Sequence, residues 1–92
     1  MQIAPKIGKR SGMFMLLNDD KQRGKIEFRL QPDTLTILHT EVDDDLTGQG
    51  YGHQLVDATA DYAREHDLRI KPLCPFARKI MTTDAQYNDV LI

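Results

Sequence analysis

Residues 39–56, HTEVDDDLTGQGYGHQLV, contain the feature that most restricts how this chain can fold. An extended pattern ends at Val42, three aspartates follow, and glycines then occupy every second position at Gly48, Gly50 and Gly52. Beyond the last glycine the apolar residues recur with helical spacing. A strand must therefore end before this loop and a helix must begin after it, and the glycines leave much of the loop backbone without side chains.

Three extended segments precede the helix. MFMLL at 13–17 is a short apolar run, and KIEFRLQ at 25–31 alternates apolar and polar residues as a half-buried strand does. TLTILHTEV at 34–42 is predicted as the next strand, although the neighbours Ile37 and Leu38 interrupt its alternation. Either both faces of the sheet are covered there or a bulge shifts the register. Short turns between these segments favour antiparallel pairing.

The segments after the loop predict a crossover. An amphipathic helix starts near Gly52, and LRIKPLC at 68–74 returns to strand character. Strand, helix and strand in this order predict a parallel βαβ unit. Pro75 suits the first turn of a second helix over 75–83. We therefore expect an α/β (α+β) fold with a mixed four-stranded sheet, a βαβ crossover and a C-terminal helix.

The size and charge of the chain exclude several classes of protein. Its 92 residues suffice for one core, so we expect a flexible N-terminal leader at 1–11 and one domain at 12–92. A net charge of −2 argues against a nucleic-acid surface, and no segment approaches the roughly 18 apolar residues of a membrane span. The only cysteine, Cys74, fits a reducing, cytoplasmic compartment. The scattered histidines predict no metal site.

Glycines before a helix favour a phosphate site, because the first helical N–H groups lack partners. Three known loop motifs fail here. A P-loop would need a lysine, a dinucleotide loop would need glycine where His53 stands, and a calcium loop from Asp43 would need glutamate where Gln54 stands. A loop that only turns the chain stays open as an alternative.

The combination of strand, glycine loop, helix and parallel strand resembles motif A of the GNAT superfamily of acyl-CoA transferases. That motif, [QR]-x-x-G-x-[GA], binds the pyrophosphate of coenzyme A. Gly50 and Gly52 match its two small positions, and Thr47 stands where the family has glutamine or arginine. Thr47 offers a hydroxyl but lacks the usual long side chain, for which Gln49 substitutes imperfectly.

Four segments narrow the resemblance to a minimal GNAT-like subfamily of about ninety residues. They are HTEV at 39–42, LTGQGYGHQLV at 46–56, AR at 63–64 and CPFA at 74–77. The resemblance implies a truncated GNAT-like fold in which residues 12–92 form an acyl-CoA-binding domain. It also implies that the parallel strands separate and hold the pantetheine arm between them.

The resemblance assigns roles to individual residues. The N–H of Val42 would meet the thioester carbonyl, and Cys74 would stand where the strands part. The pyrophosphate would be held around the loop, at Thr47, Gly48, Gln49, Gly50, Tyr51, Gly52 and His53.

Three residues are candidates for catalysis. Cys74 is either a nucleophile that meets the acyl group or a small buried hydrophobe. His39 and Glu41 lie two residues apart on one strand face, so either could take a proton from an incoming amine, or they form a polar surface pair. The aspartates at 43–45 are expected to face solvent or a cationic acceptor.

Two functions follow from these assignments. In the first, the protein moves acetyl from acetyl-CoA to an unidentified amine, which is a small molecule or a protein. In the second, it is a non-catalytic CoA-binding or interaction module. A chain of this length has few residues left to enclose an acceptor. A homodimer or a partner protein would therefore complete the site.

Overall fold

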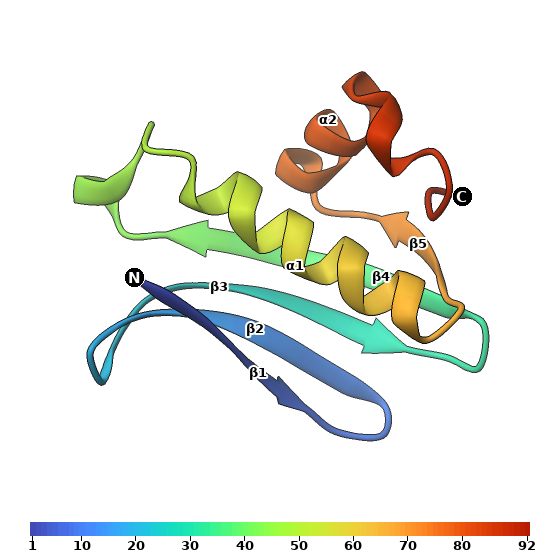
Figure 1. Ribbon diagram of the computed structural model, residues 1–92, viewed down its shortest axis with the longest axis horizontal. Helices are drawn as coiled ribbons and strands as arrows, with labels where there is room; N and C mark the ends of the chain where they lie inside the picture. Colours follow the sequence, from blue (N-terminus) through green and yellow to red (C-terminus); the bar gives the residue numbers. More distant parts are fainter.

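The computed structural model describes all residues, Met1–Ile92. Five strands, two α-helices and two short 3₁₀ helices follow one another along the chain (Figure 1). In order they are β1 (Gln2–Ile7), β2 (Ser11–Asn18), β3 (Lys21–Leu30), β4 (Thr34–Val42), η1 (Asp44–Leu46), α1 (Tyr51–Glu65), β5 (Arg69–Pro72), α2 (Pro75–Thr83) and η2 (Ala85–Tyr87).

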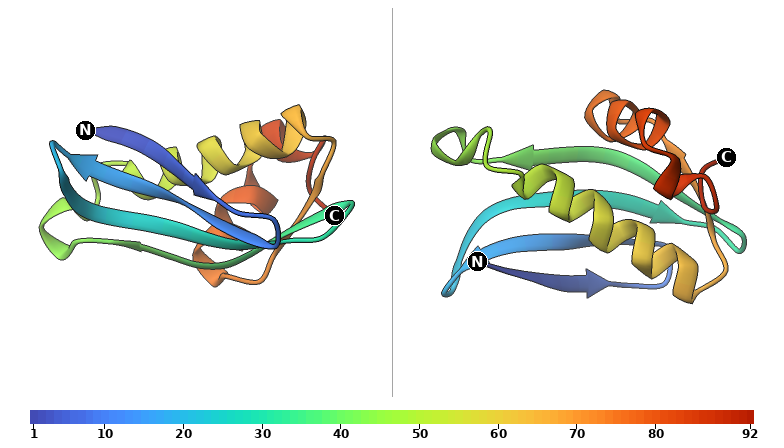
Figure 2. Two further views of the ribbon diagram at one scale, coloured as in Figure 1. Left: turned by 90° about the horizontal axis from the view of Figure 1, so that it is seen from below. Right: turned by 45° about the horizontal axis from the view of Figure 1, so that its top comes forward.

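All five strands form one sheet in the order β1-β2-β3-β4-β5. The first four are antiparallel, and β4 and β5 are parallel, joined by α1. The predicted α+β class and βαβ crossover are therefore confirmed. Figure 2 shows α1 across one face of the sheet and α2 beside β4, while the opposite face is uncovered. None of the helices combines the length and apolar character required to span a bilayer.

The sheet has five strands rather than the predicted four, because residues expected to be a flexible leader form β1. This strand pairs with β2, and Ile3 and Ile7 pack against the core. The basic residues Lys6, Lys9 and Arg10 and the lack of a long apolar run had favoured a leader. Pro5 is tolerated because β1 is an edge strand, where a missing N–H breaks no ladder in the sheet interior.

A bulge in β4 explains its broken alternation. Glu27 pairs with His39 and the next residue, Phe28, pairs with Ile37, which leaves Leu38 as the extra residue. The bulge, one of the two alternatives, is therefore confirmed. Ile37 stays fully buried and Leu38 is exposed. A bulge also bends the strand, and here it lies midway between the glycine loop and the β3–β4 turn.

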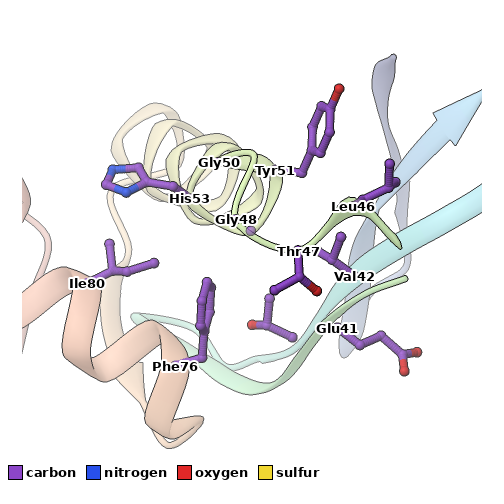
Figure 3. A pocket seen from close by; sticks show the side chains of 12 residues that line it. Glu41, Val42, Leu46, Thr47, Gly48, Gly50, Tyr51, His53, Phe76 and Ile80 are labelled. Atoms are coloured by element: carbon purple, nitrogen blue, oxygen red, sulfur yellow. The ribbon is translucent and has the colours of Figure 1, made fainter. Parts of the chain in front are cut away.

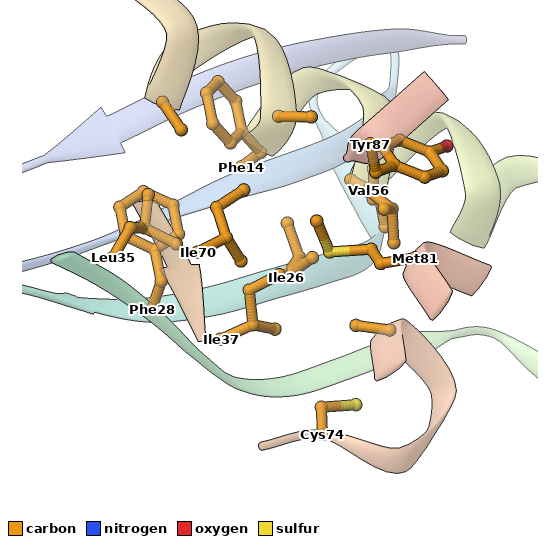
Figure 4. Packing of buried hydrophobic residues seen from close by; sticks show 14 of the residues in the cluster. Phe14, Ile26, Phe28, Leu35, Ile37, Val56, Ile70, Cys74, Met81 and Tyr87 are labelled. Atoms are coloured by element: carbon orange, nitrogen blue, oxygen red, sulfur yellow. The ribbon is translucent and has the colours of Figure 1, made fainter. Parts of the chain in front are cut away.

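The core lies between α1 and the sheet (Figure 4). The sheet buries aromatic and branched side chains against small residues of α1, so the helix approaches closely. The amphipathic helix expected from the sequence is confirmed, with one face of α1 buried and Tyr62 beside that face half-buried. The fully buried members include Leu16, Ile26, Leu35 and Ile37 of the sheet and Leu55, Val56, Ala60 and Ala63 of α1.

Candidate functional site

The parallel strands β4 and β5 separate halfway along β4. They pair only from Thr34 opposite Arg69 to Ile37 opposite Pro72. Beyond that point the N–H groups of Leu73 and Cys74 both donate to the carbonyl of Ile37, at 3.0 and 3.2 Å, and the chain turns into α2. The strand predicted over 68–74 is therefore shorter, and residues 38–42 have no strand partner on this edge.

The glycine loop carries a run of unpaired backbone amides. Gly48 and Gly50 have positive φ values of 82° and 86°, and Gly50 caps α1 without a side chain. No N–H from Gly48 to His53 donates a hydrogen bond within the protein. The first N–H groups of a helix have no carbonyl one turn earlier, and they carry a partial positive charge. Six consecutive donors are therefore available to an anion.

A cavity of about 430 Å³ connects these amides with the unpaired half of β4 (Figure 3). Its walls come from β4, the loop, the first turn of α1 and α2. The lining residues are Thr40, Glu41, Val42, Leu46, Thr47, Gly48, Gly50, Tyr51, Gly52, His53, Phe76 and Ile80.

The cavity contains most, but not all, of the residues assigned from sequence to the cofactor. Gln49 and Cys74 do not line it, and the side chain of Gln49 donates instead to the carbonyl of Asp45 at 3.4 Å. Of the two candidate bases, Glu41 lines the cavity with its carboxylate pointing away (Figure 3). His39 is not among the lining residues.

Sequence reasoning missed four lining residues from three elements. Phe76 and Ile80 are four residues apart on α2, so they lie on the same face of the helix. Their spacing after the helix-starting Pro75 could have identified them as a pair in the sequence. Thr40 stands between His39 and Glu41 in the chain, so strand alternation could have placed it on the opposite face. The fourth, Leu46, is buried in η1.

The backbone N–H of Val42 points toward the cavity. Asp43 donates its N–H to the carbonyl of Arg23 in β3, at 2.9 Å. Because successive N–H groups of a strand point to opposite edges, that of Val42 is directed to the edge where β5 is absent. An uncommitted donor therefore lies beside the cavity at the position that the sequence analysis assigned to it.

Cys74 is buried behind Thr40. Its side chain is 6% exposed, and Sγ lies 3.6 Å from Oγ1 of Thr40, which does line the cavity. Burial by itself raises the pKa of the thiol, but hydrogen bonds from the N–H of Ala77, the Thr40 side chain and the N–H of Phe76 lower it below the ordinary value. The sulfur is thus a shielded group close to the point where the strands separate.

Phe76 explains why residue 52 is glycine. A β-carbon at Gly52 would lie 2.5 Å from Cζ of Phe76, whose ring stands against the first turn of α1. By contrast, β-carbons at Gly48 and Gly50 would meet no protein atom within 4 Å. The three glycines therefore have different roles: two provide positive φ beside open space, and the third allows α1 and α2 to approach.

We expect Gly52→Ala to be coupled to Phe76. Alanine favours a helix over glycine by up to about 1 kcal/mol, so it should be neutral or stabilising in a Phe76→Ala background. With Phe76 present, the ring must move, and the same change should be less favourable by about 1 kcal/mol. Urea unfolding of the four proteins in the cycle measures this coupling. If the effects of the two substitutions on the free energy of unfolding were additive, the position of the Phe76 ring would not require glycine at residue 52.

Arg23 holds the start of the loop. Its guanidinium donates to Asp43 at 2.7 Å and to both carboxylate oxygens of Asp45 at 2.6 Å. All three aspartates are exposed to solvent, one of the two alternatives that the sequence analysis gave, and two of them also bind Arg23. These bonds fix η1, from which the unpaired amides continue.

Because of the contacts between Arg23 and the aspartates, the free energy of unfolding should depend on pH in the acidic range. The hydrogen bonds from Arg23 lower the pKa of Asp45 below its ordinary value of 3.8. Their contribution is therefore present above pH 3.8 and lost as the pH falls through the lower folded-state pKa. Urea midpoints of wild type and Arg23→Gln should differ at pH 7 and converge toward pH 2. Lys6→Gln, in β1 and without an ion pair, is the control, and a difference independent of pH would contradict the assignment.

A second polar network links η2, near the C-terminus, to α1. The hydroxyl of Tyr87 donates to Asp57 and lies 3.0 Å from Nε2 of His53. Since the hydroxyl has one proton, Nε2 of His53 must be the donor in that second bond. Burial, followed by the bond to Asp57, raises the pKa of Tyr87 far above 10. This network fixes the ring of His53, which lines the cavity.

The candidate bases belong to a chain of charges along β3 and β4. His39 lies 3.7 Å from Glu41, and Lys25 pairs with Glu41 at 3.5 Å and with Glu27 at 2.7 Å. His39 and Glu41 are more than half exposed. A proton acceptor at the surface of β4 is therefore available to an amine that approaches from solvent. No cluster of three or more His, Cys, Asp or Glu is arranged to hold a metal.

Known proteins are similar to this chain in sequence and in fold. Residues 13–90 match the family described as GCN5-related N-acetyl-transferase. A GCN5-like protein from Staphylococcus aureus has 31% sequence identity and a TM-score of 0.74, over 97% of this chain and 87% of that one. No curated protein matches the chain.

Longer proteins contain the same fold. The ribosomal-protein-S18-alanine N-acetyltransferase of Escherichia coli has a TM-score of 0.71 at 20% identity, over 84% of this chain and 53% of that one. Rv2747 of Mycobacterium tuberculosis, solved in complex with CoA, has a TM-score of 0.61 at 28% identity, over 73% of this chain and 46% of that one. This chain spans about half of each. The family match over residues 13–90 shows that the chain belongs to the GCN5-related N-acetyltransferase family.

Proposed function

We propose that this protein is an acetyl-CoA-dependent N-acetyltransferase whose glycine loop binds the diphosphate of the coenzyme. The observation that carries the proposal is the run of six unpaired N–H groups from Gly48 to His53, continuous with a cavity that reaches the unpaired half of β4. Open space at Gly48 and Gly50 leaves room for phosphate oxygens. Acetyl-CoA supplies an activated acetyl thioester.

The protein contributes binding, charge stabilisation and proton transfer. The N–H of Val42 donates to the acetyl oxygen as negative charge develops there. Glu41 or His39 takes the proton of the incoming ammonium, directly or through water. A bond would form between the amine nitrogen and the acetyl carbon as the carbon–sulfur bond breaks, and the second proton lost by the nitrogen would pass to the leaving thiolate.

The position of Cys74 favours direct transfer to the amine over transfer through the protein. The sulfur is shielded by Thr40 and does not line the cavity. We therefore expect Cys74→Ala to retain transfer, and intact mass spectrometry to detect no acetyl adduct on wild type treated with acetyl-CoA. An adduct that disappears in Cys74→Ala would establish a covalent route instead.

The open face of the sheet supports a second candidate, a CoA-binding module without its own acceptor site. His39 and Glu41 lie exposed, and no element of this chain encloses an acceptor beside them. A second copy or a partner protein would then complete the site. The unpaired Cys74 supports a reducing, cytoplasmic location for either candidate.

Two measurements separate these candidates. Thermal unfolding with CoA and with acetyl-CoA tests the coenzyme site, and a thiol-release assay with a panel of amines tests transfer. Stabilisation together with thiol release supports the enzyme, and stabilisation alone supports the module. No stabilisation by either compound would refute both.

A further inference from the structure

A second hollow lies at the other end of β4 from the glycine loop. The β1–β2 and β3–β4 turns meet at this end of the sheet (Figure 1). The hollow has a volume of about 770 Å³, and its lining is polar and basic. It is lined by Lys9, Arg10, Ser11, Arg29, Leu30, Gln31, Pro32 and Leu38.

Arg10 and Arg29 are the two arginines of this chain whose guanidinium groups have no partner. The other four bind carboxylates or carbonyl oxygens: Arg23, Arg64, Arg69 and Arg78. Lys9 in the same hollow is also unpaired, and Asp33 in the adjacent turn accepts a bond from the Thr34 hydroxyl instead. Three unopposed cations in one hollow, in a chain of net charge −2, form a site for an oxyanion.

The hollow adjoins the point where β4 and β5 separate. Leu38 lines it and directly follows Ile37, whose carbonyl binds the N–H groups of Leu73 and Cys74. Arg29 pairs with Thr36, two residues before Leu38, or about 7 Å along the strand. On the other side of Leu38 come His39 and then Glu41. Arg29 of β3, and then Leu38, His39 and Glu41 of β4, therefore follow one another along this pair of strands.

We propose that the acceptor is a small amine that also carries an oxyanion, a carboxylate or a phosphate, which the Arg10–Arg29 hollow binds. The inference rests on the proposed acetyl transfer and specifies its substrate class. Guanidinium groups suit both oxyanions because their paired N–H donors match two oxygens at once. The exposed Leu38 contacts the carbon chain, and the amine reaches His39 and Glu41. The coenzyme enters from the opposite end of β4, so the two substrates do not compete for space.

Paired acceptors test the proposal. 4-Aminobutyrate and phosphoethanolamine carry the amine and an oxyanion, whereas 1,4-diaminobutane lacks the oxyanion. We expect the Arg10→Ala/Arg29→Ala double variant to raise KM for the first two by about 10-fold or more, with kcat unchanged. Transfer to the diamine should not change. Lys21→Ala, at the far end of β3, is the control. Equal use of the diamine, or a variant that behaves as wild type, would overturn the proposal.

A binding measurement keeps this result separate from that of the proposed function. Titration of the ¹⁵N-labelled free protein with 4-aminobutyrate or phosphoethanolamine should shift the amide signals of Ser11 and Leu38, and the double variant should lose both shifts. If no amine is acetylated but these shifts occur, acetyl transfer fails and the oxyanion site stands. If neither oxyanion shifts these signals, the oxyanion site is refuted whether or not transfer occurs.

Discussion

Substitution of Gly50 by valine is expected to abolish the stabilisation of this protein by coenzyme A. Gly50 precedes α1 with φ of 86°, and a side chain there would project into open space beside the unpaired amides. With coenzyme at 100 times Kd, wild type should gain about 2.7 kcal/mol. For a domain of this size that is a rise in Tm of about 10–20 °C, and the variant should show none of it.

Asp67→Val is the matched control, because Asp67 also has a positive φ, 55°, just beyond the other end of α1. Both valines carry a backbone penalty of about 1–3 kcal/mol and lower the Tm of the free protein. The coenzyme should still stabilise the Asp67 variant, and calorimetric titration should give it the wild-type Kd. A stabilisation that survives in Gly50→Val would show that the diphosphate does not depend on this loop.

Replacement of both candidate bases is expected to reduce acetyl transfer by about 10²–10⁴-fold, the usual contribution of general base catalysis. His39 and Glu41 lie 3.7 Å apart, so either can substitute for the other, and the test needs His39→Asn and Glu41→Gln together. The loss should appear in kcat. The Tm shift with coenzyme should persist, because neither side chain supplies a loop amide.

Glu27→Gln provides the control for this double variant. Glu27 faces His39 across the two strands and shares Lys25 with Glu41, so its removal changes the local charge without removing a candidate base. We expect its transfer rate to stay close to that of wild type. A similar loss in Glu27→Gln would mean that the charge of the surface, rather than a base, controls the reaction.

Local patterns determined the elements that build the candidate site. The alternation over 34–42 and the proline-led segment over 75–83 correspond to β4 and α2 with the same limits. The glycine loop and the start of α1 were predicted because backbone freedom and helical periodicity are properties of neighbouring residues. The N–H of Val42, by contrast, was assigned to the site by the resemblance to motif A and not by these local patterns.

Contacts between distant segments were decided only by the tertiary structure. β1 forms because Ile3 and Ile7 reach the core once β2 offers an edge. The reason for Gly52 lies in the ring of Phe76, and Cys74 is shielded by Thr40 from another strand. The grouping of Lys9, Arg10 and Arg29 depends on two turns meeting at one end of the sheet. Sequence periodicity reports which face of an element is buried, but packing selects which side chains of distant elements meet.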